Sequence, residues 1–437
     1  MTEPSAHTSF LGRLLGRAAK VEPGEVAAVV ASFFLIFFVL GGYFAVRPVR
    51  ETFGTILGRS TTQDLWVVTF IGALIVVPVY GALVARIRRG VLLPLIYGSV
   101  AVCLLLFAAA INADENNRTT AAVFYVWISV LNLMLVSVFW SFTLELFDSG
   151  QAKRLFGFIA AGGTAGSLVG PLVTDQTVRY IGNTGVLVFS ALMFVGAIIA
   201  QRVLLNIWTR PQSALAPARS DRAIGGNPFA GFTLLFQSRY LMMIALFVIL
   251  LSAANSLLYF EQLSLVEKAF ASSAERTQVF ARIDFVVQAL TVISQLFITG
   301  RVAQRLGVVA LVTIVPAAMV IGFGLIALSG TLAVVIGVMI VRRWGEYSFI
   351  RPGREMLFSQ LDTETKYKAK NLIDVAVYRG ADAGLAQASK ALGAMGMTST
   401  AFAVAGAVFS ALWLAVGLWL GRRTESASAR GGVPGHH

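Results

Sequence analysis

The chain has 437 residues, of which 57% are hydrophobic and only 13% are charged. A soluble domain carries about 25% charged residues, so this composition excludes an ordinary soluble protein and indicates a polytopic membrane protein. The formal net charge of +13 does not indicate nucleic-acid binding, because the basic residues gather in alternate loops. The single cysteine, Cys103, excludes a disulfide framework, and the three histidines provide neither a metal site nor a cofactor site.

Hydropathy predicts an all-α membrane protein with twelve transmembrane helices in two six-helix bundles, since about 20 apolar residues cross a bilayer. Lys and Arg are concentrated in the segments that an inside N-terminus would leave in the cytoplasm, so both termini are expected to be cytoplasmic. We expect a monomer in the bacterial inner membrane with no removable signal peptide. The predicted spans lie near 26–47, 66–86, 91–111, 122–144, 156–178, 184–206, 240–262, 281–300, 308–329, 331–358, 370–392 and 398–420.

The first span ends in the charged sequence Arg-Pro-Val-Arg-Glu, 47–51. Helical spacing puts Tyr43, Arg47 and Arg50 on one stripe and makes Arg47 and Glu51 an i,i+4 pair. A charge at the centre of a membrane helix costs roughly 2.5–3.5 kcal/mol on insertion scales, so such residues are functional candidates. The alternative is that these arginines end the helix and reach the lipid headgroups.

The fourth and fifth spans carry polar and small residues of different kinds. Asn132, Trp140 and Glu145 lie on the fourth span as candidates for a polar interior, although Glu145 fits an interfacial position equally well. Gly162, Gly166 and Gly170 recur at every fourth residue of the fifth span. Small residues at this spacing allow helices to approach closely, which predicts helix packing here.

A polar stretch rich in Pro, Gly, Ser and Arg separates the sixth and seventh spans. We therefore predict an N-terminal bundle at 1–208, a cytoplasmic linker at 209–236 and a C-terminal bundle at 237–423. Residues 424–437, which end in two histidines, are expected to be a disordered tail and resemble a tag remnant.

Both halves have a basic, glycine-bounded turn after their second helix, and this arrangement resembles the major facilitator superfamily. Gly81, Leu83, Arg86 and Arg89 match its Gly-x-Leu-x-Asp-Arg-x-Gly-Arg-Lys motif, whereas Ala85 replaces the aspartate. The resemblance implies a substrate site near the middle of the membrane, between the two halves.

The tenth span repeats the charged sequence of the first, as Arg-Pro-Gly-Arg-Glu at 351–355. Helical spacing places Tyr347, Arg351 and Arg354 on one face and makes Arg351 and Glu355 an i,i+4 pair. Because the apolar run before them is too short to span the bilayer alone, this helix is expected to face the protein interior. Further charges or aromatic rings in the seventh to eleventh spans are Glu261, Asp284, Arg342, Arg343, Glu346, Asp374, Tyr378, Arg379 and Asp382.

Several of these segments resemble the ATP/ADP translocase family, the nucleotide transporters of plastids and obligate intracellular bacteria. The sequence EYSFIRPGREMLFSQLDTETKYKAKNLID is similar to that family's Lys-Tyr-Ser-Leu-Phe-Asp-Pro-Thr-Lys-Glu-Met block and the Lys-x-Lys-x-Lys run after it. FAVRPVRETF and VFWSFTLELFDSGQAKRLFGF are also similar to family segments. Two charges differ, because Glu346 stands where the family has Lys and Arg351 where it has Asp. The resemblance implies a transporter of a phosphorylated anion.

We therefore expect a secondary transporter, not an enzyme, that moves a nucleotide across a lipid bilayer by alternating access. Guanidinium groups suit phosphate because they bind it through two hydrogen bonds. Alternatives left open are a proton-coupled transporter or lipid flippase for another anion and, as a third class, a non-transporting scaffold. The predicted substrate-binding residues are Arg47, Arg50, Arg351, Arg354, Arg379, Tyr43, Tyr347, Tyr378, Trp140 and Asn132. The predicted ion-pair or proton-coupling residues are Glu51, Glu145, Glu261, Asp284, Glu346, Glu355, Asp374 and Asp382.

Overall fold

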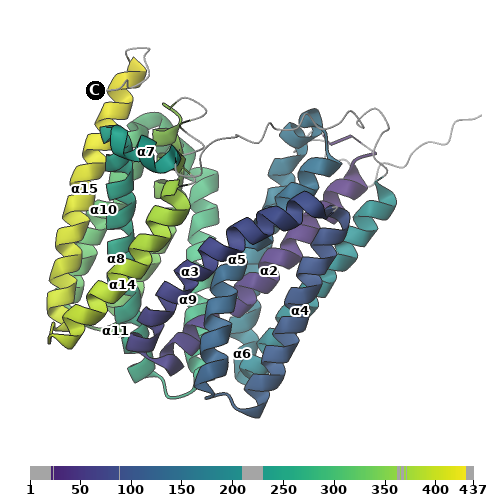
Figure 1. Ribbon diagram of the computed structural model, residues 1–437, viewed down its shortest axis with the longest axis horizontal. Coiled ribbons are helices and arrows are strands. Elements are labelled where there is room, and N and C mark those ends of the chain that lie inside the picture. Colours follow the sequence, from purple (N-terminus) through teal and green to yellow (C-terminus); the bar gives the residue numbers. More distant parts are fainter. Residues whose placement is uncertain are drawn as a thin grey trace, which may run out of the picture. The chain divides into compact units, whose positions relative to one another are not determined.

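The computed structural model describes residues 21–22, 24–87, 89–208, 230–361, 365, 369–370 and 372–429. Every regular element in these ranges is a helix (Figure 1). Of the expected linker, 209–229 lie outside the described residues and Ala230–Gln237 forms α7. Of the expected tail, 424–429 continue the last helix, and 430–437 lie outside the described residues.

Nine helices in the described ranges are long and apolar enough to cross a membrane, namely α2 to α6, α8 to α10 and α15. This agrees with the prediction of a helical, multi-pass membrane protein. The expected spans near 331–358 and 370–392 fall on helices that mix apolar and charged residues. The helices are α2 Val26–Leu57, α3 Arg59–Arg86, α4 Arg89–Ala113, α5 Arg118–Leu146, α6 Ser149–Ile207, α7 Ala230–Gln237, α8 Arg239–Ala269, α9 Ser273–Phe297, α10 Thr299–Ser329, α11 Leu332–Gly345, η2 Glu346–Ile350, α12 Arg351–Phe358, η3 Leu372–Val377, α14 Tyr378–Ala394 and α15 Ser399–Ala429.

Two glycines with positive φ divide long helices. Gly182 in α6 has φ 64° and ψ −179°, so the 59-residue element is two helices joined at a kink. Gly307 in α10 has φ 72° and separates a short basic first segment from the apolar remainder. A side chain is strained in this backbone region, and glycine is not. These two kinks match the breaks that hydropathy predicts near 180 and 307.

The chain forms two compact units. Unit 1 comprises Met1–Arg50, Ile75–Arg219 and Ser273–Phe285, and unit 2 comprises Glu51–Leu74, Ser220–Ser272 and Val286–His437. The units do not follow the two halves of the sequence. Each half contributes a segment to the unit that is formed mainly by the other half.

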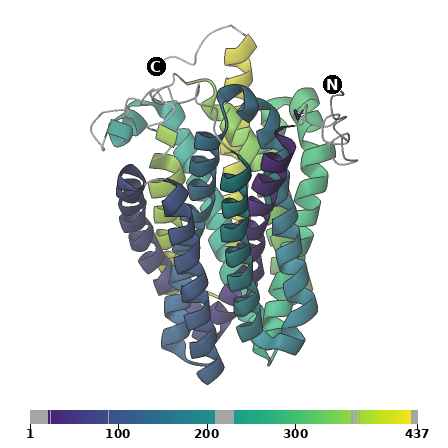
Figure 2. The same cartoon turned by 90° about the vertical axis from the view of Figure 1, so that its right-hand side faces the viewer.

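Unit 1 is held together by close contact between α2 and α6 (Figure 1, Figure 2). A Cβ added to Gly162, Gly166 or Gly170 would collide with the α2 backbone, at the carbonyl oxygens of Phe33, Phe37 and Gly41 respectively. The two backbones can approach this closely because the glycines of α6 place no side chain between them. The glycine stripe therefore packs helices, as its spacing predicts.

Unit 2 has one large hydrophobic core that includes α8, α10, α11 and α15. Trp413 of α15 is fully buried and lies edge-on to Phe247 of α8 at 5.5 Å between ring centroids. At the kink in α10, the Glu425 carboxylate accepts a hydrogen bond from the Val309 N–H at 3.1 Å. That contact satisfies a backbone donor at the start of a helix.

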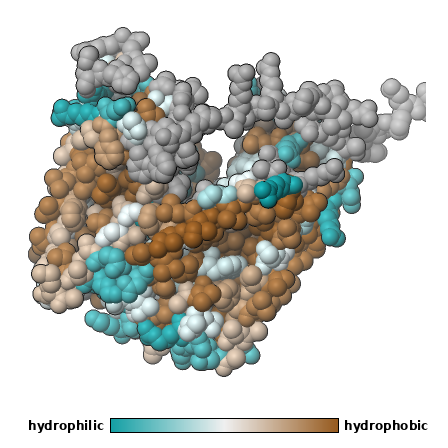
Figure 3. All heavy atoms as spheres, in the orientation of Figure 1, coloured by the Kyte–Doolittle hydropathy of each residue, from teal (hydrophilic) through white to brown (hydrophobic). Residues whose placement is uncertain are grey.

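Apolar side chains also cover much of the outer surface visible in Figure 3. Large exposed examples include Ile71, Ile75 and Val79 on α3 and Leu105 and Leu106 on α4. In water such a surface would be unfavourable, because burying apolar area is worth roughly 25 cal/mol per Å². In a bilayer these residues contact the lipid tails.

Candidate functional site

The charged part of the tenth predicted span is a helix whose register changes midway. Here α11, η2 and α12 are continuous, and η2 is a π-helical turn in which the Arg351 N–H bonds to the Glu346 carbonyl, five residues earlier. Such turns are frequent at functional sites. The turn brings the Arg351 guanidinium to 3.7 Å from the Glu346 carboxylate, five residues earlier, whereas regular α-helical spacing would have paired Arg351 with Glu355, four residues later.

Pro352 removes a backbone donor from the same helix. The Ser348 carbonyl, four residues earlier, accepts a hydrogen bond from Thr299 Oγ1 of α10 at 3.0 Å. Gln295 of α9 donates to the neighbouring Tyr347 carbonyl at 3.4 Å. Side chains of α9 and α10 therefore stabilise the proline-containing turn.

Five charged residues of this region form what we call the arginine–carboxylate cluster: Arg342, Glu346, Arg351, Arg354 and Asp374. Glu346 accepts a hydrogen bond from Arg342 at 3.0 Å and lies 3.7 Å from Arg351. Arg354 contacts Asp374 of η3 at 2.7 Å. The cluster is within unit 2 and brings together four predicted site residues from η2, α12 and η3 with Arg342 of α11.

Arg351 is the accessible cation of this cluster. Its side chain is 60% exposed, whereas those of Arg342 and Arg354 are 6% and 15% exposed. The Arg351 guanidinium lies over the Tyr347 ring at 4.5 Å, a cation–π geometry. Stacking fixes the guanidinium while its N–H groups remain available, which suits binding of an anion.

Glu355 does not follow the predicted pairing with Arg351. Its carboxylate instead pairs with Lys370, whose Nζ lies 2.6 Å from each carboxylate oxygen. Lys370 precedes η3, so this contact and Arg354–Asp374 both join α12 to the next helix. The physical reason is the π-helical turn, which turns Arg351 towards Glu346 and leaves Glu355 on the side of Lys370.

The helix η3–α14 carries the remaining predicted charges of unit 2. Asp382 is buried and accepts a hydrogen bond from the Ser252 hydroxyl of α8. Tyr378 and Arg379 are half-buried, and Arg379 interacts electrostatically with Asp382. These groups are one to two helical turns after Asp374, so they extend the cluster along α14.

The charged end of α2 forms a second and smaller group within unit 1. Arg47 pairs with Asp284 of α9 at 3.2 Å, and the Asp284 side chain is only 3% exposed. Arg50 donates to the Ser129 hydroxyl at 3.3 Å and lies 5.5 Å from the Tyr125 ring. The predicted residues Arg47, Arg50 and Asp284 therefore belong to one polar region of this unit.

Other predicted residues lie in separate surroundings. Trp140 packs against Phe139 and Phe156 in an aromatic group, Asn132 is half-buried, and Glu145 is exposed. Tyr43 is buried against Phe44. In unit 2, Glu51 accepts a hydrogen bond from Tyr259 at 2.7 Å, and Glu261 pairs with Arg59.

Sequence reasoning did not include several partners of these charges. Ser129 and Tyr125 are four residues apart in the apolar α5, and Ser252 lies within the apolar α8. The i,i+4 spacing of Tyr125 and Ser129 is the signal that would have placed them on one face. In the described ranges, no group of three or more His, Cys, Asp or Glu residues is positioned to hold a metal ion.

Comparison with solved structures places the chain among membrane transporters by fold. It matches the POT family transporter PepTSo with a TM-score of 0.64 at 12% identity, covering 91% of this chain and 98% of that one. For the D-xylose-proton symporter the TM-score is 0.63 at 14% identity, with 90% and 96% covered. For the nucleoside transporter NupG it is 0.59 at 14% identity, with 91% and 98% covered. Identities this low show the fold alone.

Sequence comparison is more specific. The chain is 28% identical over 356 residues to ADP,ATP carrier protein 1 of Chlamydia trachomatis, covering 71% of this chain and 66% of that protein. For the protein of the same name from Chlamydia pneumoniae, the identity is 26%, with 68% and 65% covered. The alignments thus span slightly less than two thirds of these relatives. The model of the TLC ATP/ADP transporter family matches residues 116–425, a range that contains the whole arginine–carboxylate cluster. The chain belongs to the TLC ATP/ADP transporter family.

Proposed function

We propose that this protein is a secondary transporter that exchanges or takes up a nucleotide of the ATP/ADP type. Family membership and the transporter fold support a carrier rather than an enzyme. The observation that supports a phosphate-bearing substrate is the geometry of Arg351. Its accessible guanidinium is stacked on Tyr347 beside the Arg354–Asp374 pair. To bind Arg351, a phosphate would have to displace only the 3.7 Å contact between Arg351 and Glu346.

In this proposal Arg351, Arg354 and Arg379 bind the anion, and Tyr347 and Tyr378 contact the base or line the site. When substrate is absent, the cations of this region are paired with the carboxylates of Glu346, Glu355, Asp374 and Asp382. Arg47 and Arg50 of α2 form a second cationic group, with Asp284 as its carboxylate partner. We further propose twelve transmembrane helices in two six-helix bundles at 1–208 and 237–423. The protein would be a monomer in the inner membrane of a bacterium, with both termini in the cytoplasm.

Counterflow of labelled ADP or ATP in proteoliposomes tests this proposal. We expect vesicles loaded with ATP to accumulate labelled ADP, and vesicles with the Arg351→Gln, Arg354→Gln double variant to lose most of that uptake. Failure of every nucleoside mono-, di- and triphosphate to exchange, with protein that elutes as a single folded species, would exclude nucleotide transport.

A second candidate is proton-coupled transport of another anion, and the buried Asp382 favours it. A carboxyl group held by a neutral hydroxyl inside a membrane helix is a typical proton carrier. Uptake driven by an imposed pH gradient, and lost in Asp374→Asn or Asp382→Asn, would support this candidate. Exchange that is independent of the gradient would exclude it. Movement of labelled phospholipid between leaflets would instead indicate a flippase.

A further inference from the structure

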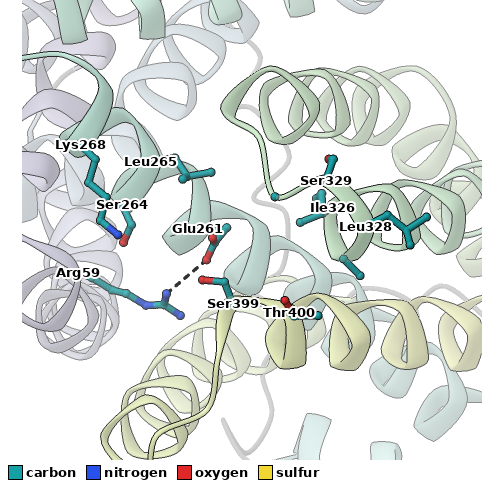
Figure 4. Close-up of a pocket in the computed structure, with 12 residues that line it drawn as sticks. Arg59, Glu261, Ser264, Leu265, Lys268, Ile326, Leu328, Ser329, Ser399 and Thr400 are labelled. Carbon is teal, nitrogen blue, oxygen red and sulfur yellow. Dashed lines mark ion pairs between the residues drawn. The ribbon is translucent and has the colours of Figure 1, made fainter.

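Unit 2 contains a cavity of about 350 Å³ that is separate from the arginine–carboxylate cluster (Figure 4). It lies where the ends of α8 and α10 meet the starts of α3 and α15. Both polar and apolar groups line it. They are Arg59, Glu261, Ser264, Leu265, Lys268, Ile326, Ala327, Leu328, Ser329, Gly330, Ser399 and Thr400.

Arg59 contacts both an aromatic ring and a carboxylate in this cavity. Its guanidinium carbon lies 4.8 Å from the centre of the Phe402 ring. The contact to Glu261 is 3.6 Å long, longer than a charge-assisted hydrogen bond of 2.7–2.9 Å. Both side chains are mostly buried, at 25% and 14% exposure. A loosely paired, partly desolvated guanidinium gains substantially from a better anionic partner.

A second cation and three hydroxyl groups surround the same space. Lys268 follows Ser264 by one helical turn on α8, is exposed, and forms no ion pair within the described part of the chain. The hydroxyls of Ser264, Ser399 and Thr400 also line the cavity, whereas the Ser329 hydroxyl already donates to the Leu325 carbonyl. Among the described residues that line the cavity, Glu261 is the only carboxylate, so Arg59 and Lys268 leave this lining with one excess positive charge.

We infer that this cavity binds the phosphate group of an organic phosphate, which replaces Glu261 as the partner of Arg59. Two cations and three hydroxyl donors exceed what the two oxygens of a carboxylate can use, whereas a phosphate offers three strongly accepting oxygens. The volume is in the range of small-molecule sites, and Leu265, Ile326 and Leu328 provide an apolar wall for the ester group. Binding would also remove the Arg59–Glu261 contact between α3 and α8, whereas the packing of Trp66 on Tyr259 and Phe260 would continue to join these helices.

Protection of an introduced cysteine measures this binding directly. Leu328→Cys in the full-length Cys103→Ala background places one exposed thiol at the cavity and keeps every proposed phosphate donor, and the rate of its reaction with a maleimide is followed in detergent micelles. We expect inorganic phosphate to slow the reaction several-fold relative to potassium chloride of equal ionic strength. Asn116→Cys in the same background is the matched control, because this exposed residue of the α4–α5 turn does not line the cavity.

Three second-site variants make the result specific. Arg59→Gln should abolish protection, and Lys268→Gln should raise the phosphate concentration needed for half-protection. Glu261→Gln should lower that concentration several-fold, because it removes the competing carboxylate. A gain of binding cannot arise from misfolding, so this variant tests the proposal even if Arg59→Gln is unstable.

The phosphate can come from a soluble ester or from a lipid headgroup, and mixed micelles distinguish these sources. Protection by phosphatidylglycerol but not by inorganic phosphate would identify a lipid as the ligand, and the reverse would identify a solute. The inference is overturned if neither protects, if acetate protects as well as phosphate, or if Glu261→Gln weakens protection. ADP counterflow is measured separately, so a failure here leaves the transport proposal intact.

Discussion

Arg351 lies 3.7 Å from Glu346, five residues before it in the chain, and not over Glu355, four residues after it. The cause is the π-helical turn at Glu346–Ile350, which shifts the register of the helix by about one residue. Because the resulting contact is long and the side chain is 60% exposed, Arg351 is available to a ligand. Arg354, one turn later, is instead held tightly by Asp374.

Arg351→Gln should weaken nucleotide binding with little effect on stability. A charge-assisted contact is worth about 1.5–3 kcal/mol, so we expect the half-saturating nucleotide concentration to rise about tenfold or more. The melting temperature should change little, since exposed ion pairs contribute at most about 1 kcal/mol. Initial rates of counterflow and thermal denaturation measure the two effects.

The matched control for Arg351 is Arg423→Gln, since Arg423 also stacks on an aromatic ring, that of Trp419 at 5.3 Å. It is outside the arginine–carboxylate cluster and should leave nucleotide affinity unchanged. Equal losses of affinity in both variants would contradict a binding role for Arg351.

Asp374→Asn should destabilise the protein, because it leaves the mostly buried Arg354 without the carboxylate 2.7 Å away. Partial exposure of Asp374 reduces the cost to about 1–2 kcal/mol. The Arg354→Gln, Asp374→Asn double variant should be more stable than the sum of the single variants predicts. A double-mutant cycle of melting temperatures measures this coupling, and strict additivity would show that the pair contributes nothing.

Gly166→Ala should destabilise unit 1 strongly. The added Cβ would collide with the Phe37 carbonyl oxygen and approach the Gly41 nitrogen to 2.9 Å, and α2 cannot shift without moving its whole backbone. Overpacking of this kind costs about 1–3 kcal/mol, occasionally more. Gly157→Ala on the same helix meets no atom within 4 Å. It should be neutral or stabilising, because alanine is the better helix former. Melting temperatures of the two variants should therefore move apart, and similar values would contradict the packing role.

Glu25 should give a pH-dependent contribution to stability. Burial by itself raises the pKa of Glu25, but hydrogen bonds from the Glu22 N–H, Gln151 and Arg154 outweigh burial and hold the pKa below its ordinary value. A lowered folded-state pKa stabilises the protein above the unfolded-state pKa, and this contribution is lost as pH falls through the folded-state pKa. Near neutral pH, the free energy of unfolding of Glu25→Gln should therefore be about 1 kcal/mol lower than that of wild type, and the variant should melt at a lower temperature. The difference should close below about pH 4. A difference that persists at low pH would show that the charge of Glu25 is not its cause.

Hydropathy and residue spacing predict much of this protein because membrane helices are determined locally. Every backbone polar group in a bilayer must be satisfied within its own helix, so a run of apolar residues is enough to indicate a span. The kinks at Gly182 and Gly307 fall where the apolar runs break, and the stripe at Gly162, Gly166 and Gly170 packs as its spacing indicates.

The partners of the charged residues, by contrast, depend on tertiary structure. The sequence shows that Arg47 and Arg351 begin the same five-residue signature, but it cannot show that Arg47 pairs with Asp284, 237 residues away, while Arg351 turns back to Glu346. Ion pairs form between side chains that the fold brings within about 4 Å, and one π-helical turn is enough to change which carboxylate that is. The sequence by itself determined the membrane helices and which residues carry charge into them. Only the packing of α9, α10 and η3 against those helices decided which charges are paired and which guanidinium remains available to a ligand.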